Sequence, residues 1–423
     1  MNIDYIRDRL GSVVGNTDKF YSMADSGILS LGRLAVGVVL ARVAGAEAFG
    51  EFVLLTTIGV IIMSLVTAKY FTPMIVLTSG ALDVGKGRVI GWFKARLLRV
   101  HLVGIVLGVT GLTVVNFFDF DLWIYLAFIA STLSGLELCF YRSRMQSEFR
   151  MRRGLNADIL GLLSMGGVMY LMWFHFDRPA LGFWIGSSIG SGCAIFLMRR
   201  CLPENRDANI GSIELEKTEL METTRMGNSM FVGSMANSIC SRVQPFVLAS
   251  VGGTIAVATF GVAWSFLGPI RMLTASLTGV LRPRLAKFRQ KEDWVAFNRY
   301  SRLSCRTLGV VGAVGVVIAA VLGPNIAVFV FGEPMRSAGY LLPIAFAYAT
   351  LDAVTTVQMI SIQAKGASGA AWATKQRIHV AVLSLVLIGP SCYYFEGWGA
   401  FGALLVSESV YLLKARRMLA GGE

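Results

Sequence analysis

Three arginines that lie deep within long apolar segments are the residues of this sequence best suited to bind an anion. Arg33 is near the middle of ILSLGRLAVGVVLARV (residues 28–43), and Arg242 and Arg271 have comparable positions in later segments. A charge near the centre of a bilayer costs about 2.5–3.5 kcal/mol on insertion scales, so an ionisable residue kept there is functional by default. Guanidinium groups bind carboxylates and phosphates through paired hydrogen bonds.

Small polar residues accompany these arginines at helical spacing. In the first segment the polar positions precede Arg33 by three and seven residues, and a similar group precedes Arg242. Lipid would leave such a stripe without hydrogen-bond partners, so the stripe faces protein or water. The sequence therefore predicts a hydrated cleft that is lined by Ser26, Ser30, Asn237, Ser238, Ser241, Asp352 and Gln363.

Two further basic residues lie near the ends of apolar segments. Lys69 is at the inner end of the second segment, where it either joins Arg33, Arg242 and Arg271 in binding substrate or extends to the interface. Arg42 follows Arg33 by nine residues, which places it on the opposite side of the helix, and it is predicted to extend to the outer interface.

A purely structural role for the arginines is the competing interpretation. Arg33 could pair with Asp352 inside a helix bundle, and Ser and Asn commonly bond across packed membrane helices. The other acidic candidates are Glu408 and Glu137, of which Glu137 is close enough in sequence to pair with Arg142. Because pairing would not explain deep arginines in both halves of the chain, a cationic cleft for an anionic cargo is favoured.

The composition is that of a polytopic membrane protein. Of the 423 residues 55% are hydrophobic and 15% charged, and the mean hydropathy is +0.62. About 20 apolar residues cross a bilayer as a helix, which predicts an all-α fold with about twelve transmembrane helices. The predicted spans are 22–44, 50–73, 97–117, 121–141, 155–175, 180–198, 227–250, 254–279, 306–331, 338–363, 376–395 and 398–414. Pro245 and Pro269 are predicted to bend the seventh and eighth spans.

Basic residues orient these spans. The predicted inner loops 142–153 and 282–306 are dense in Arg and Lys, whereas the outer turns are short and mostly acidic. By the positive-inside rule both termini are cytoplasmic. The net charge of +13 suits inner loops that lie against an anionic leaflet, so nucleic acid is not needed to explain it. We expect a multi-pass protein of the bacterial cytoplasmic (inner) membrane.

Enzymatic and metal-binding functions are not predicted. The six cysteines and three histidines are scattered without ligand spacing. GALDVGKG (residues 80–87) has the spacing of a phosphate-binding loop, but Gly87 stands where Ser or Thr would hold magnesium. The short outer turns leave no room for a catalytic domain. No cofactor or metal is expected.

The two halves of the chain echo each other. Residues 39–50 read VLARVAGAEAFG and residues 247–261 read VLASVGGTIAVATFG, and each phrase follows an arginine within a span. Internal repeats that frame a site near the membrane midplane are typical of transporters. We predict an N-terminal six-helix lobe (1–205), a cytoplasmic linker (206–226) and a C-terminal six-helix lobe (227–423), pseudo-symmetric around a central cleft.

Four segments resemble the polysaccharide-repeat flippases of the Wzx type, in the multidrug/oligosaccharidyl-lipid/polysaccharide exporter superfamily. They are VLARVAGAEAFGEFVLLTTIG, VFVFGEPMRSAGYLLPIAFAYATLDAVTTVQMISIQAKG, GVLRPRLAKF and GWGAFGALLVSESVYLL. The resemblance implies two lobes around a cleft that opens alternately to either side. It also implies a cargo of undecaprenyl-pyrophosphate-linked oligosaccharide for O-antigen, capsule or exopolysaccharide synthesis. Arg33 and Arg242 would then bind the pyrophosphate or acidic sugars.

The resemblance also sets the expected partners and the alternatives. We expect a polyprenyl-pyrophosphate-linked oligosaccharide and membrane lipids as partners, other polysaccharide assembly proteins as further candidates, and function as a monomer. The alternatives are a cation-coupled drug or metabolite extruder of the same superfamily, a membrane-embedded polysaccharide polymerase or ligase, and a non-transporting scaffold. An extruder of cations would favour a cleft rich in carboxylates, and a polymerase or ligase would need a large outer loop.

Overall fold

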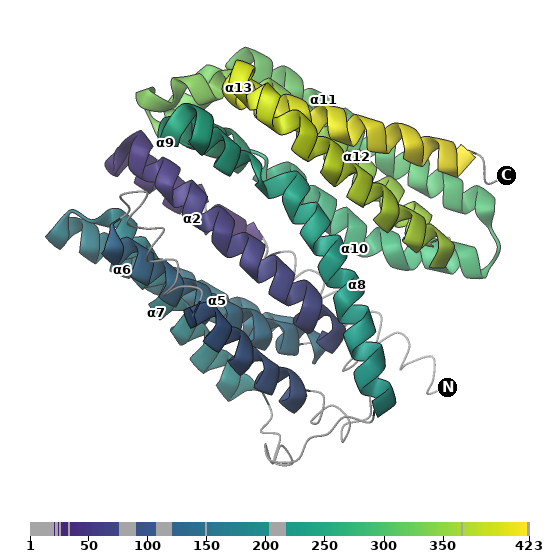
Figure 1. Cartoon of the computed structure of the whole chain (residues 1–423), viewed down its shortest axis with the longest axis horizontal. Coiled ribbons are helices and arrows are strands. Elements are labelled where there is room, and N and C mark those ends of the chain that lie inside the picture. Colours follow the sequence, from purple (N-terminus) through teal and green to yellow (C-terminus); the bar gives the residue numbers. More distant parts are fainter. Residues whose placement is uncertain are drawn as a thin grey trace, which may run out of the picture. The chain divides into compact units, whose positions relative to one another are not determined.

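The computed structural model of the chain is almost entirely helical (Figure 1). It describes residues 21, 24, 27–32, 34–75, 90–106, 121–148, 150–202, 217–364 and 367–420, and contains no β-strand within them. The described helices form two compact units. Unit 1 contains the described residues up to Val36 together with Gly59–Ser234, and unit 2 contains Gly37–Ile58 and the described residues from Met235 onward.

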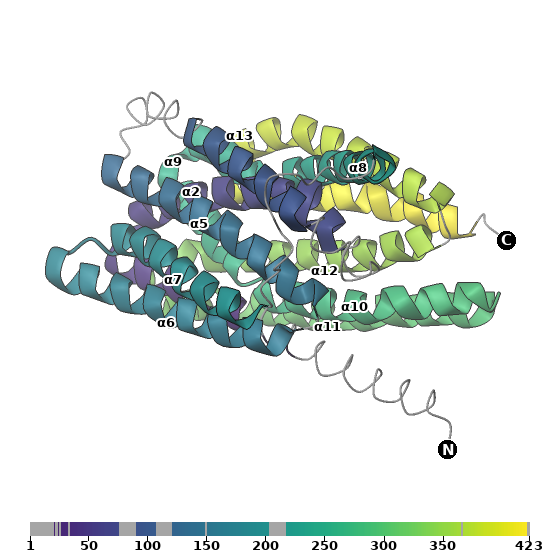
Figure 2. The ribbon, with the colours of Figure 1, turned by 90° about the horizontal axis from the view of Figure 1, so that it is seen from below.

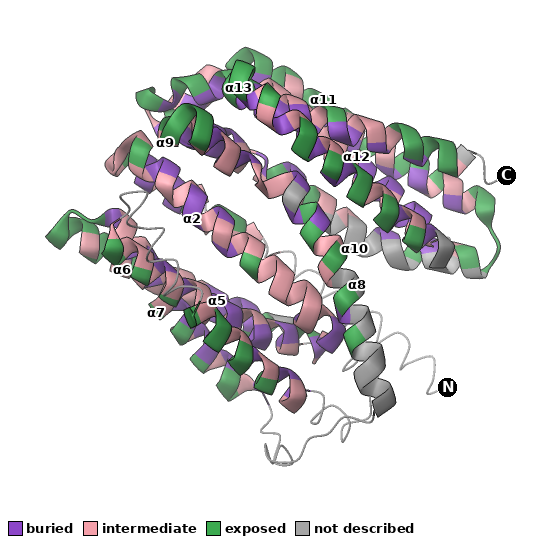
Figure 3. Ribbon diagram, viewed as in Figure 1, coloured by how far each residue is buried: buried purple, intermediate pink, exposed green. Residues whose placement is uncertain are grey.

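Unit 1 is organised by three long apolar helices, with further helix at 90–106. They are α5 (Leu122–Ser147), α6 (Met151–Phe176) and α7 (Pro179–Cys201), and α6 packs along α7 (Figure 2). Asp121 caps α5 by accepting a hydrogen bond from the Trp123 backbone N–H at 2.8 Å. Along α6 most residues stay exposed or half-buried (Figure 3), as expected for a helix whose apolar surface meets lipid.

Unit 2 contains the C-terminal helices. Those wholly within it are α9 (Gln244–Ser265), α10 (Gly268–Gln290), α11 (Trp294–Phe331), the short η2 (Glu333–Met335), α12 (Arg336–Ala364) and α13 (Ala367–Ala420). Two further helices, α2 (Gly45–Val66) and α8 (Lys217–Arg242), contribute residues to both units. Within unit 2, α12 packs against α11, α13 and α10.

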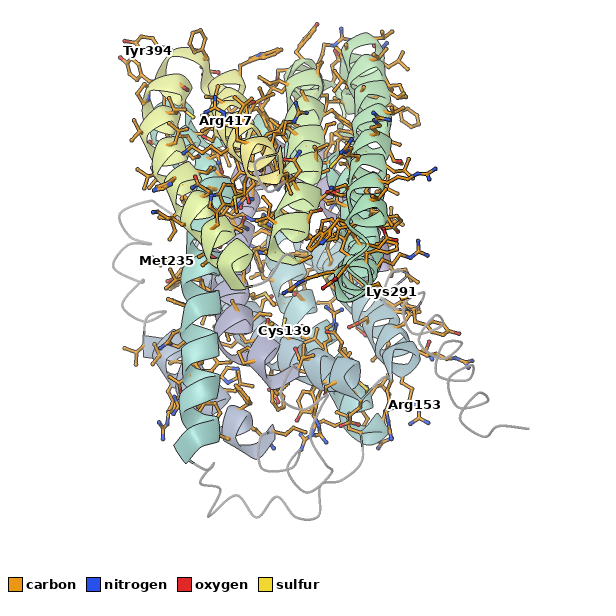
Figure 4. All side chains as sticks on the ribbon, turned by 90° about the vertical axis from the view of Figure 1, so that its right-hand side faces the viewer. Cys139, Arg153, Met235, Lys291, Tyr394 and Arg417 are labelled. Carbon is orange, nitrogen blue, oxygen red and sulfur yellow. The ribbon has the colours of Figure 1, made fainter. Side chains whose placement is uncertain are left out.

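Two of the elements in unit 2 reverse direction internally. Gly253 in α9 has φ 69°, and Glu396 in α13 has φ 46°, so each element is a pair of helices joined by a tight turn. Figure 4 labels Tyr394 near the α13 turn and Lys291 in the turn between α10 and α11, at opposite ends of the unit 2 helices. Turns near Gly45, Asp177, Gly253, Gly332 and Glu396, where the sequence predicts them, are confirmed by positive φ angles, and their outer location stays a prediction.

The chain is an all-α polytopic membrane protein. Among the described residues, eight helical stretches are long and apolar enough to cross a membrane. Two of these, Phe231–Ser265 and Ala371–Leu419, contain the reversals at Gly253 and Glu396, so each belongs to two of the predicted spans. The described helices agree with the predicted spans, and the first and third of these fall partly outside the described residues.

At residues 282–306 the helices extend further than hydropathy predicts. Residues 282–306, predicted as a loop, form the end of α10 and the start of α11, joined by a short turn at 291–293. Charged and polar residues form helices readily, so hydropathy marks where a span leaves the apolar core and not where the helix ends. Asp293 then caps α11 by accepting from the Ala296 N–H at 2.9 Å.

The echoed phrases are equivalent in backbone conformation and pack against each other. Gly45 (φ 85°) and Gly253 (φ 69°) occupy matching positions and both turn the chain through the left-handed region. Downstream of each turn, a side chain on Gly50 would strike the backbone of Thr254, and one on Gly261 would strike Val53. The predicted lobe boundaries and the pseudo-symmetry of the two halves stay predictions.

Candidate anion-binding site in unit 2

Arg242 and Arg271 each lie next to a break between two helices. Pro245 has no N–H to donate to the Ser241 carbonyl, and the chain bends at Val243, between the end of α8 and the start of α9. Pro269 has the same effect on the junction between α9 and α10. The predicted bends at both prolines are confirmed. Arg242 is the last residue of α8, and Arg271 lies in the first turn of α10.

A buried glutamine stabilises the first of these breaks. Gln244 is fully buried, and its side-chain N–H donates to the Cys240 carbonyl at 2.5 Å. That carbonyl would accept from the Gln244 backbone N–H in a continuous helix, so the side chain replaces the lost bond. The break is therefore a built feature of the chain and not a frayed helix end.

Both arginines contact the same aromatic side chain. The Arg271 guanidinium carbon lies 3.8 Å from the centroid of the Trp264 ring, and that of Arg242 lies 5.8 Å from it. Trp264 also stacks on Tyr348 of α12, with centroids 6.0 Å apart. Trp is the best ring for a cation, with about 0.5–2 kcal/mol available per contact depending on desolvation. We call Arg242, Trp264, Arg271 and Tyr348 the arginine–tryptophan site.

An ion-pair network lies beside the arginine–tryptophan site. Arg377 of α13 donates from Nη1 to Oε1 of Glu408 at 2.5 Å, and its Nη2 donates to Oδ1 of Asn237 at 3.0 Å. Glu408 also accepts a hydrogen bond from the Thr355 hydroxyl at 2.9 Å. The second carboxylate, on Asp352, has its Oδ1 3.7 Å from Nη2 of Arg377. We call Asn237, Asp352, Thr355, Arg377 and Glu408 the ionic network.

Asp352 connects the arginine–tryptophan site with the ionic network. Tyr348 precedes Asp352 by one helical turn on α12, so both side chains lie on the same face. Arg271 is close to this face, because its guanidinium lies on the Trp264 ring, which stacks on Tyr348. Arg377 thus pairs with both carboxylates, and Arg242 and Arg271 contact the neighbouring Trp264 ring.

This arrangement is suited to bind a phosphate group. Arg242, Arg271 and Asp352 are half-buried, so they are reachable from outside the unit, whereas Glu408 is buried. The positive end of α10 lies at the arginine–tryptophan site and adds to the cationic character. A half-buried guanidinium that is held against an aromatic ring is pre-oriented to donate hydrogen bonds to a planar or tetrahedral oxyanion.

Four of the predicted site residues come together in unit 2: Arg242, Arg271, Asn237 and Asp352. Ser241 donates to the Asn237 carbonyl at 2.8 Å, Ser238 is buried, and Gln363 lies near the end of α12. Ser30 is exposed in the described part of the first span. Arg33 and Ser26 fall outside the described residues, and so does the proposed Arg33–Asp352 pair.

Lys69 is found in a different setting, in unit 1. It lies in a π-helical turn, η1 (Thr67–Phe71), within the second predicted span. Its ammonium is 5.2 Å from the Phe231 ring centroid and 5.8 Å from that of Tyr70. Turns of π-helix occur frequently at functional sites, and the predicted role of Lys69 in substrate binding stays a prediction.

Sequence reasoning missed Arg377 and Trp264. Hydropathy starts the eleventh span at residue 376, which makes Arg377 an interfacial residue, but α13 begins at Ala367 and places Arg377 ten residues into the helix. A signal was present, because Asp352 and Glu408 were left without an assigned base in the same half of the chain. Trp264 gave no comparable signal, since aromatic residues are common in apolar helices.

Two other arginines have partners that the sequence analysis did not predict. Arg42 is exposed and bonds the end of α11: its Nε donates to the Val330 carbonyl at 2.9 Å and its Nη2 to the Phe329 carbonyl, and its predicted place at the outer interface stays a prediction. Arg142 pairs with Asp158 of α6, with Nη2 and Oδ2 2.6 Å apart, a partner that the sequence analysis did not consider. Both arginines bond to another helix, and hydropathy alone does not report which helices are neighbours.

Comparison with known proteins was made by sequence and by structure. No family model matches the chain, and no curated protein matches it. Solved structures do match. An inward-facing multidrug resistance MATE family transporter of the MOP superfamily has a TM-score of 0.71 at 14% identity, over 93% of this chain and 94% of the other. The lipid II flippase MurJ, inward closed, has a TM-score of 0.68 at 12% identity, over 97% and 87%.

A third neighbour is a MOP superfamily transporter from Pyrococcus furiosus, whose binding pocket is described as having reverse polarity. It has a TM-score of 0.65 at 13% identity, over 95% of this chain and 94% of the other. At these identities the comparisons establish the fold. The chain has the fold of MOP superfamily transporters and flippases, and these neighbours are transport proteins and not enzymes.

Proposed function

We propose that the chain is a flippase that moves polyprenyl-pyrophosphate-linked oligosaccharide repeat units across the bacterial cytoplasmic membrane by alternating access, with both termini in the cytoplasm. The observation that carries the proposal is the arginine–tryptophan site, in which Arg242 and Arg271 share one aromatic ring in segments that the sequence analysis places in the membrane. Keeping two guanidinium groups at that depth is costly, and an anionic headgroup is the ligand that offsets the cost.

The chemistry of the cargo fits this arrangement. A pyrophosphate carries at least two negative charges, and guanidinium forks match its oxygens through charge-assisted hydrogen bonds. With the headgroup neutralised inside the protein, the polyprenyl tail can stay in lipid throughout the crossing. Because the cargo must also leave, separated bases that are already partly neutralised are better suited than one tight cluster.

The fold supports a lipid-linked cargo. MurJ, one of the structures that this chain resembles over nearly its whole length, is a lipid II flippase. Export of repeat units for O-antigen, capsule or exopolysaccharide is the specific role that we propose, with the lipid-linked oligosaccharide and membrane lipids as partners. Arg33 and Lys69 are proposed as further cationic contacts along the path of the headgroup.

A cation-coupled extruder is the second candidate, and two observations favour it. MATE transporters are among the structural neighbours, and unit 2 contains the carboxylates of Asp352 and Glu408. Both carboxylates already face Arg377, however, and arginine is always protonated in proteins. Positive charge therefore predominates among the described residues of the site, which favours an anionic cargo.

Deletion of the encoding gene tests the proposed function. A flippase mutant should accumulate complete lipid-linked repeat units that stay on the cytoplasmic face, and should lose the surface polymer. Complementation with the intact gene should clear the accumulated units and restore the polymer. A deletion strain with normal polymer, normal lipid-linked intermediates and raised sensitivity to cationic drugs would replace this proposal with the extruder.

A further inference from the structure

The two carboxylates that face Arg377 are held very differently. Glu408 has a side chain only 4% exposed, accepts from Arg377 at 2.5 Å, and is bonded by the Thr355 hydroxyl on its other oxygen. Asp352 has a side chain 27% exposed, and its Oδ1 lies 3.7 Å from Nη2 of Arg377, which is longer than a direct hydrogen bond. Glu408 is therefore a fixed partner of Arg377, and Asp352 is a loose one.

Asp352 also lies near a second base. Its carboxylate faces Arg377, and Tyr348, one helical turn away, stacks on the same Trp264 ring that the Arg271 guanidinium contacts. It has the charge and the two-oxygen geometry that a phosphate would present to the same guanidinium forks. Because the Asp352 side chain is partly exposed, little desolvation opposes the separation of its carboxylate from the guanidinium groups.

We propose that Asp352 is an exchangeable counter-ion, which neutralises Arg271 and Arg377 in the empty protein and is displaced by the phosphate of the cargo. This inference rests on the proposed function, and Asp352 is the residue that adjusts the affinity of the site for the cargo phosphate. A site with uncompensated arginines would hold a pyrophosphate tightly and release it slowly. Competition from Asp352 weakens the bound state and promotes release, because the carboxylate returns to the guanidinium groups as the headgroup leaves.

The competition predicts that removing the carboxylate raises affinity. Asp352→Asn keeps the size of the side chain and removes its charge. The purified full-length variant should bind inorganic pyrophosphate about fivefold more tightly than the unmodified protein, the fold-change expected when an exposed ion pair of about 1 kcal/mol no longer competes. Isothermal titration calorimetry of the two proteins in the same detergent and salt measures this difference.

A matched control removes the same charge elsewhere in unit 2. Glu333 precedes α12, is exposed, and pairs with Arg336 at 2.9 Å. Glu333→Gln should leave pyrophosphate affinity unchanged, which separates local competition from a general change in net charge. If Asp352→Asn has a lower thermal unfolding midpoint than the unmodified protein, Asp352→Ser removes the same carboxylate and repeats the comparison.

The outcomes separate this inference from the function on which it rests. Tighter binding by the Asp352 variants, with Glu333→Gln unchanged, supports the exchange. If the unmodified protein binds pyrophosphate and the Asp352 variants bind it equally or more weakly, the counter-ion role is wrong and the flippase proposal stands. If neither the unmodified protein nor the variants bind pyrophosphate, both are contradicted.

Discussion

Nη1 of Arg377 lies 2.5 Å from Oε1 of Glu408, although the two residues are 31 positions apart and on opposite sides of the reversal at Glu396. The bond joins the two halves of α13. Through Asn237 and Thr355 the same pair is connected to α8 and α12. Four helical segments thus meet at one buried ion pair, which fixes the frame on which the arginine–tryptophan site is built.

Breaking this pair should destabilise the protein. Arg377→Leu leaves the Glu408 carboxylate buried without its base, and Glu408→Leu leaves the guanidinium without its acid. Each single change is expected to cost about 3–5 kcal/mol of unfolding free energy, whereas replacing both residues by leucine is expected to cost much less. Thermal unfolding in detergent, analysed as a double-mutant cycle, measures the coupling. Additive losses would show that the two side chains do not depend on each other.

The packing of the echoed hairpins gives a second prediction. A methyl group on Gly50 would meet the backbone of Thr254, and one on Gly402 would meet nothing within 4 Å. Gly50→Ala should therefore cost about 1–3 kcal/mol through overpacking. Gly402→Ala, within α13, should be neutral or slightly stabilising, because alanine loses less conformational freedom in a helix. Equal unfolding midpoints for the two variants would rule out the close approach of α2 and α9.

The orientation of α11 provides a third prediction. This helix has 38 residues, from Trp294 to Phe331, and at ~1.5 Å per residue it is long enough to cross the membrane and extend beyond it. Lys291 lies just before it and Glu333 just after it. In a background without the six native cysteines, Glu333→Cys should react with an impermeant maleimide in intact cells. Lys291→Cys should react only after permeabilisation, and the reverse pattern would invert the topology.

Much of the fold could be predicted from sequence because the signals are local. Apolar runs mark the spans, glycines with left-handed φ at positions 45 and 253 mark two of the turns, and Pro245 and Pro269 mark the helix breaks. Each of these depends on a few consecutive residues. The helix ends at 282–306 were misplaced because hydropathy reports where lipid ends and not where the backbone hydrogen bonds end.

The site was predicted less completely because its contacts are not local. Arg242, Arg271, Asn237 and Asp352 stand out singly, as polar residues in apolar helices, and the structure brings them together. Arg377 does not stand out in the sequence, because its depth within the helix depends on α13 starting at Ala367. Which carboxylate is fixed and which is loose depends on the Thr355 hydroxyl and on burial, neither of which a span assignment contains.

The central claim is that the arginines of unit 2 carry an anionic, lipid-linked cargo across the bilayer. The most direct measurement is flipping of a labelled undecaprenyl-pyrophosphate oligosaccharide in proteoliposomes, scored by the fraction that an added glycosidase can reach with time. The intact protein should move the label. Arg271→Ala should abolish movement, and Arg271→Lys should restore part of it, because the charge remains and the fork does not. Movement at the normal rate by Arg242→Ala and Arg271→Ala, each incorporated at normal levels, would contradict the account.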